Sequence, residues 1–298
     1  MKFLKSLVVM VICFGAINAE AFSLFSKPKA PSREKVTIST YADFFPFGYN
    51  APNNRSDFDS LSVFDNTLHQ ILDEEYEIKS QYYPTTSEAL SDVKIGKVDM
   101  FLGVYYGSKA YDGIEVVFPA AINNPVHVMM LPSKIGKIQK PKDLAALKGV
   151  YHRQEYFSDF VVQNFAKMNM QAVDTADEAF ELLVTGQADY MLGSYYFNYA
   201  KVLEAGLKDY ISFSKKPLWK MPLFIGVSKN FARTSTLVKQ LARILNNPSF
   251  QTKVKEDLKE MMKGVEEKYS GVVPPAYIRG ESSDELTPAD ETLSEGQK

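Results

Sequence analysis

Arg153 and two pairs of neighbouring tyrosines have side chains whose chemistry suits contact with a small molecule. The planar guanidinium of an arginine binds a carboxylate through two parallel hydrogen bonds. Arg153 stands at the end of a predicted strand and before a predicted helix, where it faces either a ligand or open solvent. The tyrosine pairs, Tyr105–Tyr106 and Tyr195–Tyr196, each follow a predicted strand. Because successive strand side chains point to opposite faces, we expect one tyrosine of each pair to point inward and the other outward.

The other reactive side chains form no recognisable catalytic or metal-binding pattern. The histidines, His69, His127 and His152, are scattered and show neither an HExxH motif nor a pair four residues apart. No GxSxG motif and no P-loop occurs. We therefore expect a protein that is not an enzyme and that carries no metal and no cofactor. An acid pair remains open as an alternative, with Asp43 and Glu155 as its members and His152 beside them.

Both tyrosine pairs belong to a segment that the chain contains twice. TTSEALSDVKIGKVDMFLGVYY and TADEAFELLVTGQADYMLGSYY align without a gap at a constant offset of 90 residues. The alignment pairs Glu88 with Glu178 and Tyr106 with Tyr196. Two copies are too few for a solenoid, which needs at least three stacked units. The repeat therefore predicts two similar lobes.

Strand and helix patterns alternate within each predicted lobe. In the first, strands are expected at 36–42, 77–83 and 98–103, and helices at 63–75 and 86–96. In the second, strands are expected at 150–153, 171–175 and 188–194, and helices at 158–168 and 177–184. Such alternation predicts a mostly parallel sheet with helices on both faces, an α/β class.

Two extended segments connect the predicted lobes. VVFPAAINNPVHVMML leads out of the first lobe, and ISFS followed by LFIGVSK leads back. This predicts a second lobe inserted into the first, with lobe 1 at 36–130 and 216–270 and lobe 2 at 131–215. The helices predicted at 235–245 and 250–269 are expected to pack back onto lobe 1.

The first residues of the chain predict its compartment. Residues 1–21 contain Lys2 and Lys5, an apolar run and then small residues, which is the pattern of a secretory signal peptide. The apolar run is shorter than the ~20 residues that span a bilayer, and an uncleaved anchor is the alternative. Cys13 lies inside this run, so the mature protein would contain no cysteine. We expect a periplasmic protein.

The composition, the segment after the signal peptide and the C-terminal segment add to this prediction. Residues 22–35 are expected to form a leader, and the polar, acidic residues 271–298 a disordered tail. With 45% hydrophobic and 23% charged residues, the chain can bury a sizeable core. Its formal charge of −2 provides no field for nucleic acid or anionic lipid. We expect a monomer without a nucleic-acid partner and without membrane insertion after signal cleavage.

Several segments between Val36 and Tyr269 together resemble one protein family. They are YADFFPFGY, SDFDSLSVFDNTLHQIL, EALSDVKIGKVDMFLG, VVFPAAINNPVHVMM, KPKDLAALKGV and ELLVTGQADYML. This combination resembles the type II periplasmic solute-binding proteins of family 3, the group of amino-acid receptors of ABC transporters. The resemblance implies a Venus-flytrap protein with two lobes and two hinge crossings. It would close on a small solute and deliver it to an inner-membrane permease.

The resemblance and the geometry of α/β sheets predict the same place for the site. Ligands bind beyond the carboxyl ends of the strands, where helix N-termini offer free N–H groups. The loops at these ends are expected at 43–49, 103–109, 152–158 and 193–196. The residues expected to bind the ligand are Phe44, Phe47, Tyr105, Tyr106, Lys109, Arg153, Ser194 and Tyr195.

Two residues that hold an amino acid in the family are missing from this chain. Amino-acid receptors place an arginine after the lobe-1 strand and an aspartate at the end of the lobe-2 strand. This chain has Lys109 or Ala110 at the first place and Ser194 at the second. A lysine does not reproduce the fork of an arginine, and unmatched charges in a desolvated cleft are costly. We therefore expect a sugar-like, aromatic or otherwise weakly charged solute instead of an ordinary α-amino acid.

Two other functions stay open for a protein with this sequence. A sensor or scaffold lobe has the same fold and does not deliver its solute to a permease. Some proteins of this fold are dehydratases, which would consume a substrate with a pH profile set by an acid or base.

Overall fold

A computed structural model describes residues 33–41, 72, 75–106, 111–135, 138, 140–153, 155 and 157–279 of the chain. The predicted signal peptide, most of the predicted leader and the chain after Arg279 lie outside these residues. So does the helix predicted at 63–75, apart from Leu72 and Glu75. Within the described part of the chain, no helix is both long and apolar enough to cross a bilayer.

The first lobe is built on three parallel strands, as predicted. β1 (Glu34–Tyr41) pairs along its whole length with β2 (Tyr76–Tyr83) and also pairs with β3 (Met100–Val104). Helix α3 (Thr86–Lys94) connects β2 to β3 and ends just before Gly96, whose φ of 78° favours glycine. All five residues of β3 are buried. We call this part lobe 1.

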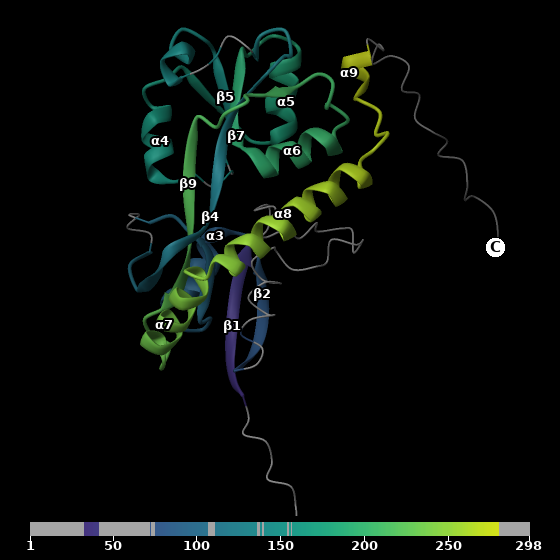
Figure 1. The fold of residues 1–298 in the computed structure, drawn as a ribbon. Helices are drawn as coiled ribbons and strands as arrows, with labels where there is room; N and C mark the ends of the chain where they lie inside the picture. The colour runs from purple at the N-terminus through teal and green to yellow at the C-terminus, as the bar shows by residue number, and fades with distance from the viewer. Residues whose placement is uncertain are drawn as a thin grey trace, which may run out of the picture.

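A second set of parallel strands forms the other end of the molecule, again as predicted. β5 (Gly149–His152) lies between β6 (Met170–Val173) and β7 (Tyr190–Ser194). Helix α4 (Asp159–Phe165) follows β5, and helix α5 (Ala176–Val184) follows β6. We call this part lobe 2; Figure 1 shows it at the top, with lobe 1 below.

Two long strands run between the lobes and pair with each other. β4 (Ile114–Met130) and β9 (Trp219–Ser228) are antiparallel, and their pairing is irregular between Val117 and Ile122. β9 also pairs with β3 of lobe 1, whereas the end of β4 pairs with β7 and with β8 (Ser212–Phe213) in lobe 2. The strand order is therefore β2-β1-β3-β9-β4-β7-β5-β6. The two predicted crossings are confirmed.

The repeated sequence segment has the same structural role in both lobes. The side chains of Thr85 and Thr175 cap α3 and α5, each accepting a hydrogen bond from the N–H three residues later. The carboxylates of Asp99 and Asp189 each accept a hydrogen bond from a backbone N–H at the neighbouring strand. The repeat thus preserves two features in each lobe. One is the threonine that caps a helix, and the other is the aspartate, just before the third strand, that accepts a backbone hydrogen bond.

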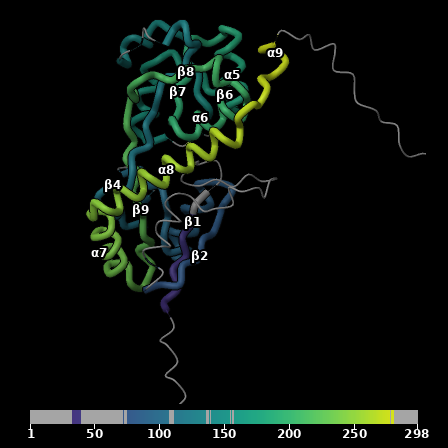
Figure 2. Tube along the Cα trace, turned by 45° about the vertical axis from the view of Figure 1, so that its right-hand side comes forward, coloured from purple at the N-terminus to yellow at the C-terminus, as the bar shows by residue number. Residues whose placement is uncertain are grey.

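The last long helix packs on both lobes, which differs from the prediction. α7 (Thr234–Leu245) packs on lobe 1 as expected. In α8 (Pro248–Lys268), Val254 belongs to the hydrophobic core that includes lobe 1, whereas Val265 belongs to a second core in lobe 2. Figures 1 and 2 both show α8 running from one lobe to the other. With a rise of about 1.5 Å per residue, its apolar stripe is long enough to reach both.

Three helices have no counterpart in the sequence-based prediction. They are α6 (Tyr195–Glu204), α9 (Ala276–Arg279) and the 3-10 helix η4 (Pro141–Leu144). α9 belongs to the segment predicted as a disordered tail, whose residues up to Arg279 are ordered here. The backbone before α9 packs closely on lobe 2, since a Cβ on Gly206 would lie 2.8 Å from the carbonyl oxygen of Val272.

Candidate functional site

The carboxyl ends of the parallel strands of both lobes meet beside the two crossing strands. On the lobe 1 side, the residues after β3 contact β4, because Asn124 Nδ2 donates a hydrogen bond to Tyr105 Oη over 3.3 Å. On the lobe 2 side, the backbone N–H of Ser158 donates to Sδ of Met221 in β9 over 3.4 Å. Glu155 of lobe 2 also acts electrostatically on the Tyr105 hydroxyl across this junction. The candidate site is this junction.

The lobe 1 tyrosines point in opposite directions, as strand alternation predicts. Tyr105 is 2% exposed, and burial raises its pKa. Tyr106 is 66% exposed, and its ring packs against Phe118 and Phe224 with centroid distances of 5.1 and 6.1 Å. Tyr105 therefore faces the junction, and Tyr106 contributes to an aromatic surface on lobe 1.

The lobe 2 tyrosines do not alternate, and that part of the prediction was wrong. Tyr195 and Tyr196 form the first turn of α6 instead of extending β7, so both are partly buried. Tyr195 stacks on Tyr199 one turn later, with centroids 5.4 Å apart, and its ring also lies 5.1 Å from His127. Tyr196 packs against two hydrophobic clusters, one within lobe 2 and one that contains residues of both lobes.

Arg153 lies at the edge of lobe 2 and is engaged with β6. Its side chain is 62% exposed, and Nη1 lies 3.5 Å from a carboxylate oxygen of Asp174. Nη2 donates to the carbonyl oxygen of Ala172, and its backbone N–H donates to that of Val173. These contacts do not bring the guanidinium together with Tyr105 or the end of β7.

Ser194 ends β7 and lies next to a carboxyl group. Its backbone N–H donates a short hydrogen bond to Glu155 Oε1, and Asn198 Nδ2 donates to Glu155 Oε2 over 2.9 Å. Gly193 makes room for this arrangement, because a Cβ there would lie 2.2 Å from Asn198 Nδ2 and 3.0 Å from Glu155 Oε2. A carboxyl group thus stands beside Ser194, where amino-acid receptors of the resembled family carry an aspartate.

The Glu155 carboxyl group lies in a strongly perturbed environment. Burial raises its pKa to about 7, although hydrogen bonds from Ser194 and Asn198 act in the opposite direction. Within the described part of the chain, no lysine, arginine or histidine forms an ion pair with it. The backbone N–H at the start of α6 is its nearest electropositive group. From the sequence, Glu155 was expected only as one member of an alternative catalytic acid pair.

Asn124 is a site residue that was not predicted from the sequence. It lies on β4 where this strand passes between the lobes, and it is 2% exposed. Its Nδ2 donates to Tyr105, while its Oδ1 accepts no hydrogen bond from any described residue. The sequence does contain a signal, since Asn123–Asn124 interrupts an apolar crossing strand.

His127 and His152 lie in buried surroundings that suit a structural role. Nδ1 of His127 lies 2.8 Å from the carbonyl oxygen of Ser214, and burial lowers its pKa. The ring of His152 is buried and stacks against Phe197 with centroids 6.2 Å apart. Among the residues that the structure describes, no group of three potential metal ligands gathers.

The residues predicted before the first lobe 1 helix and after the lobe 1 tyrosines are not described. Phe44, Phe47 and Lys109, as well as Asp43 of the alternative acid pair, lie outside the described residues. The described site therefore consists of Tyr105, Asn124, Glu155, Ser194 and Asn198.

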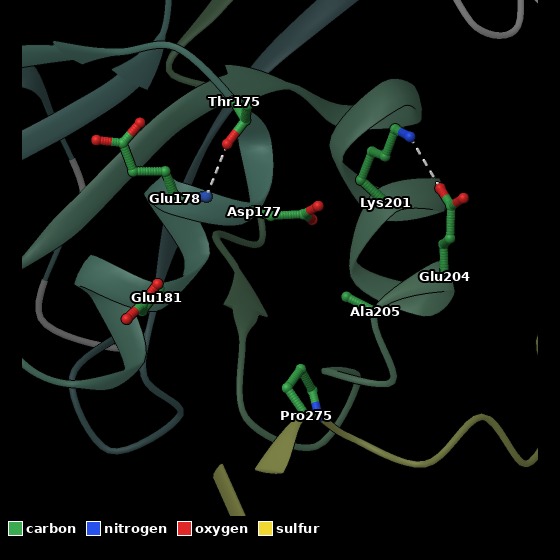
Figure 3. Close-up of a pocket in the computed structure, with 8 residues that line it drawn as sticks. All are labelled: Thr175, Asp177, Glu178, Glu181, Lys201, Glu204, Ala205 and Pro275. Atoms are coloured by element: carbon green, nitrogen blue, oxygen red, sulfur yellow. Dashed lines mark hydrogen bonds and ion pairs between the residues drawn. The ribbon is translucent and has the colours of Figure 1, made fainter. Parts of the chain in front are cut away.

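A separate hollow of about 550 Å³ lies on lobe 2 between α5 and α6 (Figure 3). Its lining includes Asp177, Glu181 and Glu204, and Lys201 bonds to Glu204 over 2.9 Å. No residue of lobe 1 is among those that line it.

Comparison with known proteins identifies the fold. No family model matches the sequence, and no curated protein does. The amino acid ABC transporter substrate-binding protein AbpA from Streptococcus pneumoniae, bound to L-arginine, matches with a TM-score of 0.59 at 13% identity, over 78% of this chain and 95% of that chain. The GluR0 ligand-binding core in complex with L-glutamate matches with a TM-score of 0.57 at 11% identity, over 76% of this chain and 99% of that chain.

A third match is a histidine kinase sensor domain similar to periplasmic binding proteins. It has a TM-score of 0.55 at 14% identity, and the match covers 82% of this chain and 99% of that chain. The chain has the two-lobed fold of these binding proteins. The α/β fold predicted from the sequence is therefore confirmed, and proteins that share this fold include solute receptors and sensor domains.

Proposed function

We propose that the protein is a periplasmic, monomeric receptor that captures a small polar or aromatic solute between its lobes and delivers it to an ABC-type permease. The observation that supports this most directly is the convergence of Tyr105, Asn124 and Glu155, which come from lobe 1, a crossing strand and lobe 2. The fold shared with an ABC transporter substrate-binding protein supports the transport role. The signal-peptide pattern of residues 1–21 supports the location.

Binding is coupled to closure of the lobes in this proposal. A solute shifts the population toward the closed arrangement when it makes contacts that exist only with both lobes engaged. The residues proposed from the sequence as cleft residues remain part of the proposal: Phe44, Phe47, Tyr105, Tyr106, Lys109, Arg153, Ser194 and Tyr195.

A sensor function is the second candidate. It is favoured by α8, which packs on both lobes and thereby limits how far they can separate. A receptor that reports binding needs only a small rearrangement, whereas delivery to a permease requires the cleft to open. One structural neighbour is a histidine kinase sensor domain.

A ligand screen tests solute binding. The mature chain is unfolded and refolded to remove bound solute and is then screened by thermal shift against amino acids, sugars, polyamines and aromatic acids. A ligand at 100 times its Kd stabilises the protein by about 2.7 kcal/mol. If no class raises the melting temperature of the folded protein, the proposal of a small-molecule receptor is wrong.

Trp219 provides a second readout for closure. It is the only tryptophan of the chain, it begins β9, and its ring lies 6.2 Å from that of Phe165 in lobe 2. We expect a solute that closes the lobes to change the emission of this tryptophan. Uptake by cells that lack the protein then separates the two functions: transport predicts lost uptake of the solute, and sensing predicts unchanged uptake.

A further inference from the structure

The described residues around Tyr105, Asn124 and Glu155 offer hydrogen-bond acceptors. Arg153, the described cation among the proposed cleft residues, is engaged with Asp174 and Ala172 instead. Glu155 contributes a carboxyl group from lobe 2, and Asn124 contributes a buried amide oxygen from the crossing strand. Both lie near Tyr105: its hydroxyl accepts a hydrogen bond from Asn124, and the charge of Glu155 acts on it. Pairing of Val126 in β4 with Ser194, whose N–H bonds to Glu155, also brings the two segments together. This combination selects for a ligand that brings donors and positive charge.

Glu155 carries the first part of the argument. Buried charges in proteins are normally paired, because an isolated ion loses its hydration without compensation. The partners of this carboxyl group are the backbone N–H and the hydroxyl group of Ser194 and the side-chain amide of Asn198, all of which are neutral. Each carboxylate oxygen can accept more than one hydrogen bond, so a cation can still be added.

Asn124 carries the second part. An amide oxygen has two lone pairs, and Oδ1 of Asn124 uses neither with any described residue, although the side chain is 98% buried. Most buried polar groups are hydrogen-bonded, so an unused acceptor at the junction of two lobes indicates a partner that arrives with the ligand. Its Nδ2 is fixed by Tyr105, which holds Oδ1 in one orientation.

We propose that the solute carries a protonated amine or guanidinium group that binds between Glu155 and Asn124 Oδ1 beside Tyr105. This inference rests on the proposed function and names the class of solute. It replaces the weakly charged solute expected from Ser194, because the carboxylate missing at that position is supplied by Glu155 from another loop.

The proposal requires an ionised Glu155 and therefore predicts pH dependence. The groups that face its carboxyl group are Ser194 and Asn198 from lobe 2 and the Tyr105 hydroxyl from lobe 1. Burial raises the pKa of Tyr105, so this hydroxyl stays neutral around pH 7. With a carboxyl pKa of about 7, affinity for a cation should be about tenfold weaker at pH 6 than at pH 8.

Calorimetry with defined probes tests the class of solute. The probes are agmatine, putrescine, spermidine and L-arginine, with glucose and shikimate as compounds without a cation. Wild type is compared with Glu155→Gln and with the matched control Glu181→Gln, which removes one exposed lobe 2 carboxylate outside the cleft. We expect at least one cationic probe to bind wild type and the control equally, and Glu155→Gln to weaken it at least tenfold and to abolish the pH dependence.

The outcomes separate this inference from the proposed function. Cationic probes that bind Glu155→Gln as tightly as wild type overturn the inference. Binding of an uncharged probe in place of the cationic ones overturns it as well and leaves the receptor function intact. Absence of binding by every probe and by the wider screen overturns both.

A second variant covers the case in which Glu155→Gln does not fold. Asn124→Asp keeps the shape of the side chain and adds a second carboxylate beside the proposed cation. We expect it to bind the cationic probe more tightly at pH 8 than wild type does, by several fold. Unchanged or weaker binding by folded Asn124→Asp would contradict the proposal.

Discussion

Glu155 decides the chemistry of the junction at the level of single residues. Its carboxyl group is enclosed by Gly193, Ser194 and Asn198. Gly193 has no side chain to fill the space, Ser194 donates its backbone N–H, and Asn198 donates a side-chain amide N–H. The sequence predicted Ser194 as a site residue and read it as the loss of a carboxylate. The contact between Ser194 and Glu155 was not predicted, because Glu155 lies 39 residues before Ser194 in the chain.

The raised pKa of Glu155 predicts how stability changes with pH. Its ordinary value is 4.5, and its value in the folded protein is about 7, so the folded state binds its proton more tightly than the unfolded state. The stability that the folded protein gains from this tighter proton binding is fully present below about pH 4.5 and is lost as pH rises through 7. We expect Glu155 to lower the free energy of unfolding by up to about 3 kcal/mol between these values.

Urea denaturation of wild type and Glu155→Gln between pH 5 and pH 8 measures this effect. Relative to wild type, the glutamine variant should gain stability as the pH rises from 5 to 8, because it has no carboxyl group to ionise. A difference that is independent of pH would show that the carboxyl group ionises at its ordinary value in the folded protein.

At the level of elements, the sequence predicted the alternating strands and helices of both lobes well. It could do so because the repeat contains local signals, namely a capping threonine, a C-terminal glycine and an apolar strand. α6 was not predicted. Ser194 is its N-cap, but the side chain of Ser194 makes no capping hydrogen bond. The N–H of Ser194 is bound by Glu155 from another segment, which no local pattern contains.

The two threonine caps should contribute similar stability. Thr85→Ala and Thr175→Ala each remove the side-chain acceptor at the start of a helix, and we expect each to cost about 1 kcal/mol of unfolding free energy. Ser87→Ala, in the exposed first turn of α3, is the control and should change stability by a few tenths of a kcal/mol. Chemical denaturation checks this. Equal effects of Ser87→Ala and Thr85→Ala would contradict the capping role.

For the whole molecule, α8 sets how the lobes are held together. The sequence predicted that this helix packs on lobe 1 alone, because its apolar stripe carries no information about which surface it meets. Tyr199 of α6 strengthens the lobe 2 contact by donating a hydrogen bond to Glu266 over 2.6 Å. Met261 and Met262 lie between and pack on both cores. Methionine side chains are flexible, which suits a contact with two different surfaces.

Matched truncations at the two ends of α8 test this role. Val265→Ala removes a contact with lobe 2, and Val254→Ala removes one with lobe 1. We expect Val265→Ala to speed hydrogen exchange in the last two turns of α8 and to leave the first two turns protected, and Val254→Ala to do the opposite. Uniform loss of protection in both variants would mean that α8 opens as one unit.

The pairing of β4 with β9 also brings the entry and the exit of lobe 2 together. Its chain leaves and returns through adjacent partners, Val126 and Trp219, so the two cut ends would lie side by side. Joining them with a two-residue turn would convert the crossing strands into an ordinary hairpin, and the strand order β2-β1-β3-β9-β4 would stay complete. The chain thus enters and leaves lobe 2 at one paired junction, while a shared hydrophobic cluster and α8 join the two lobes elsewhere.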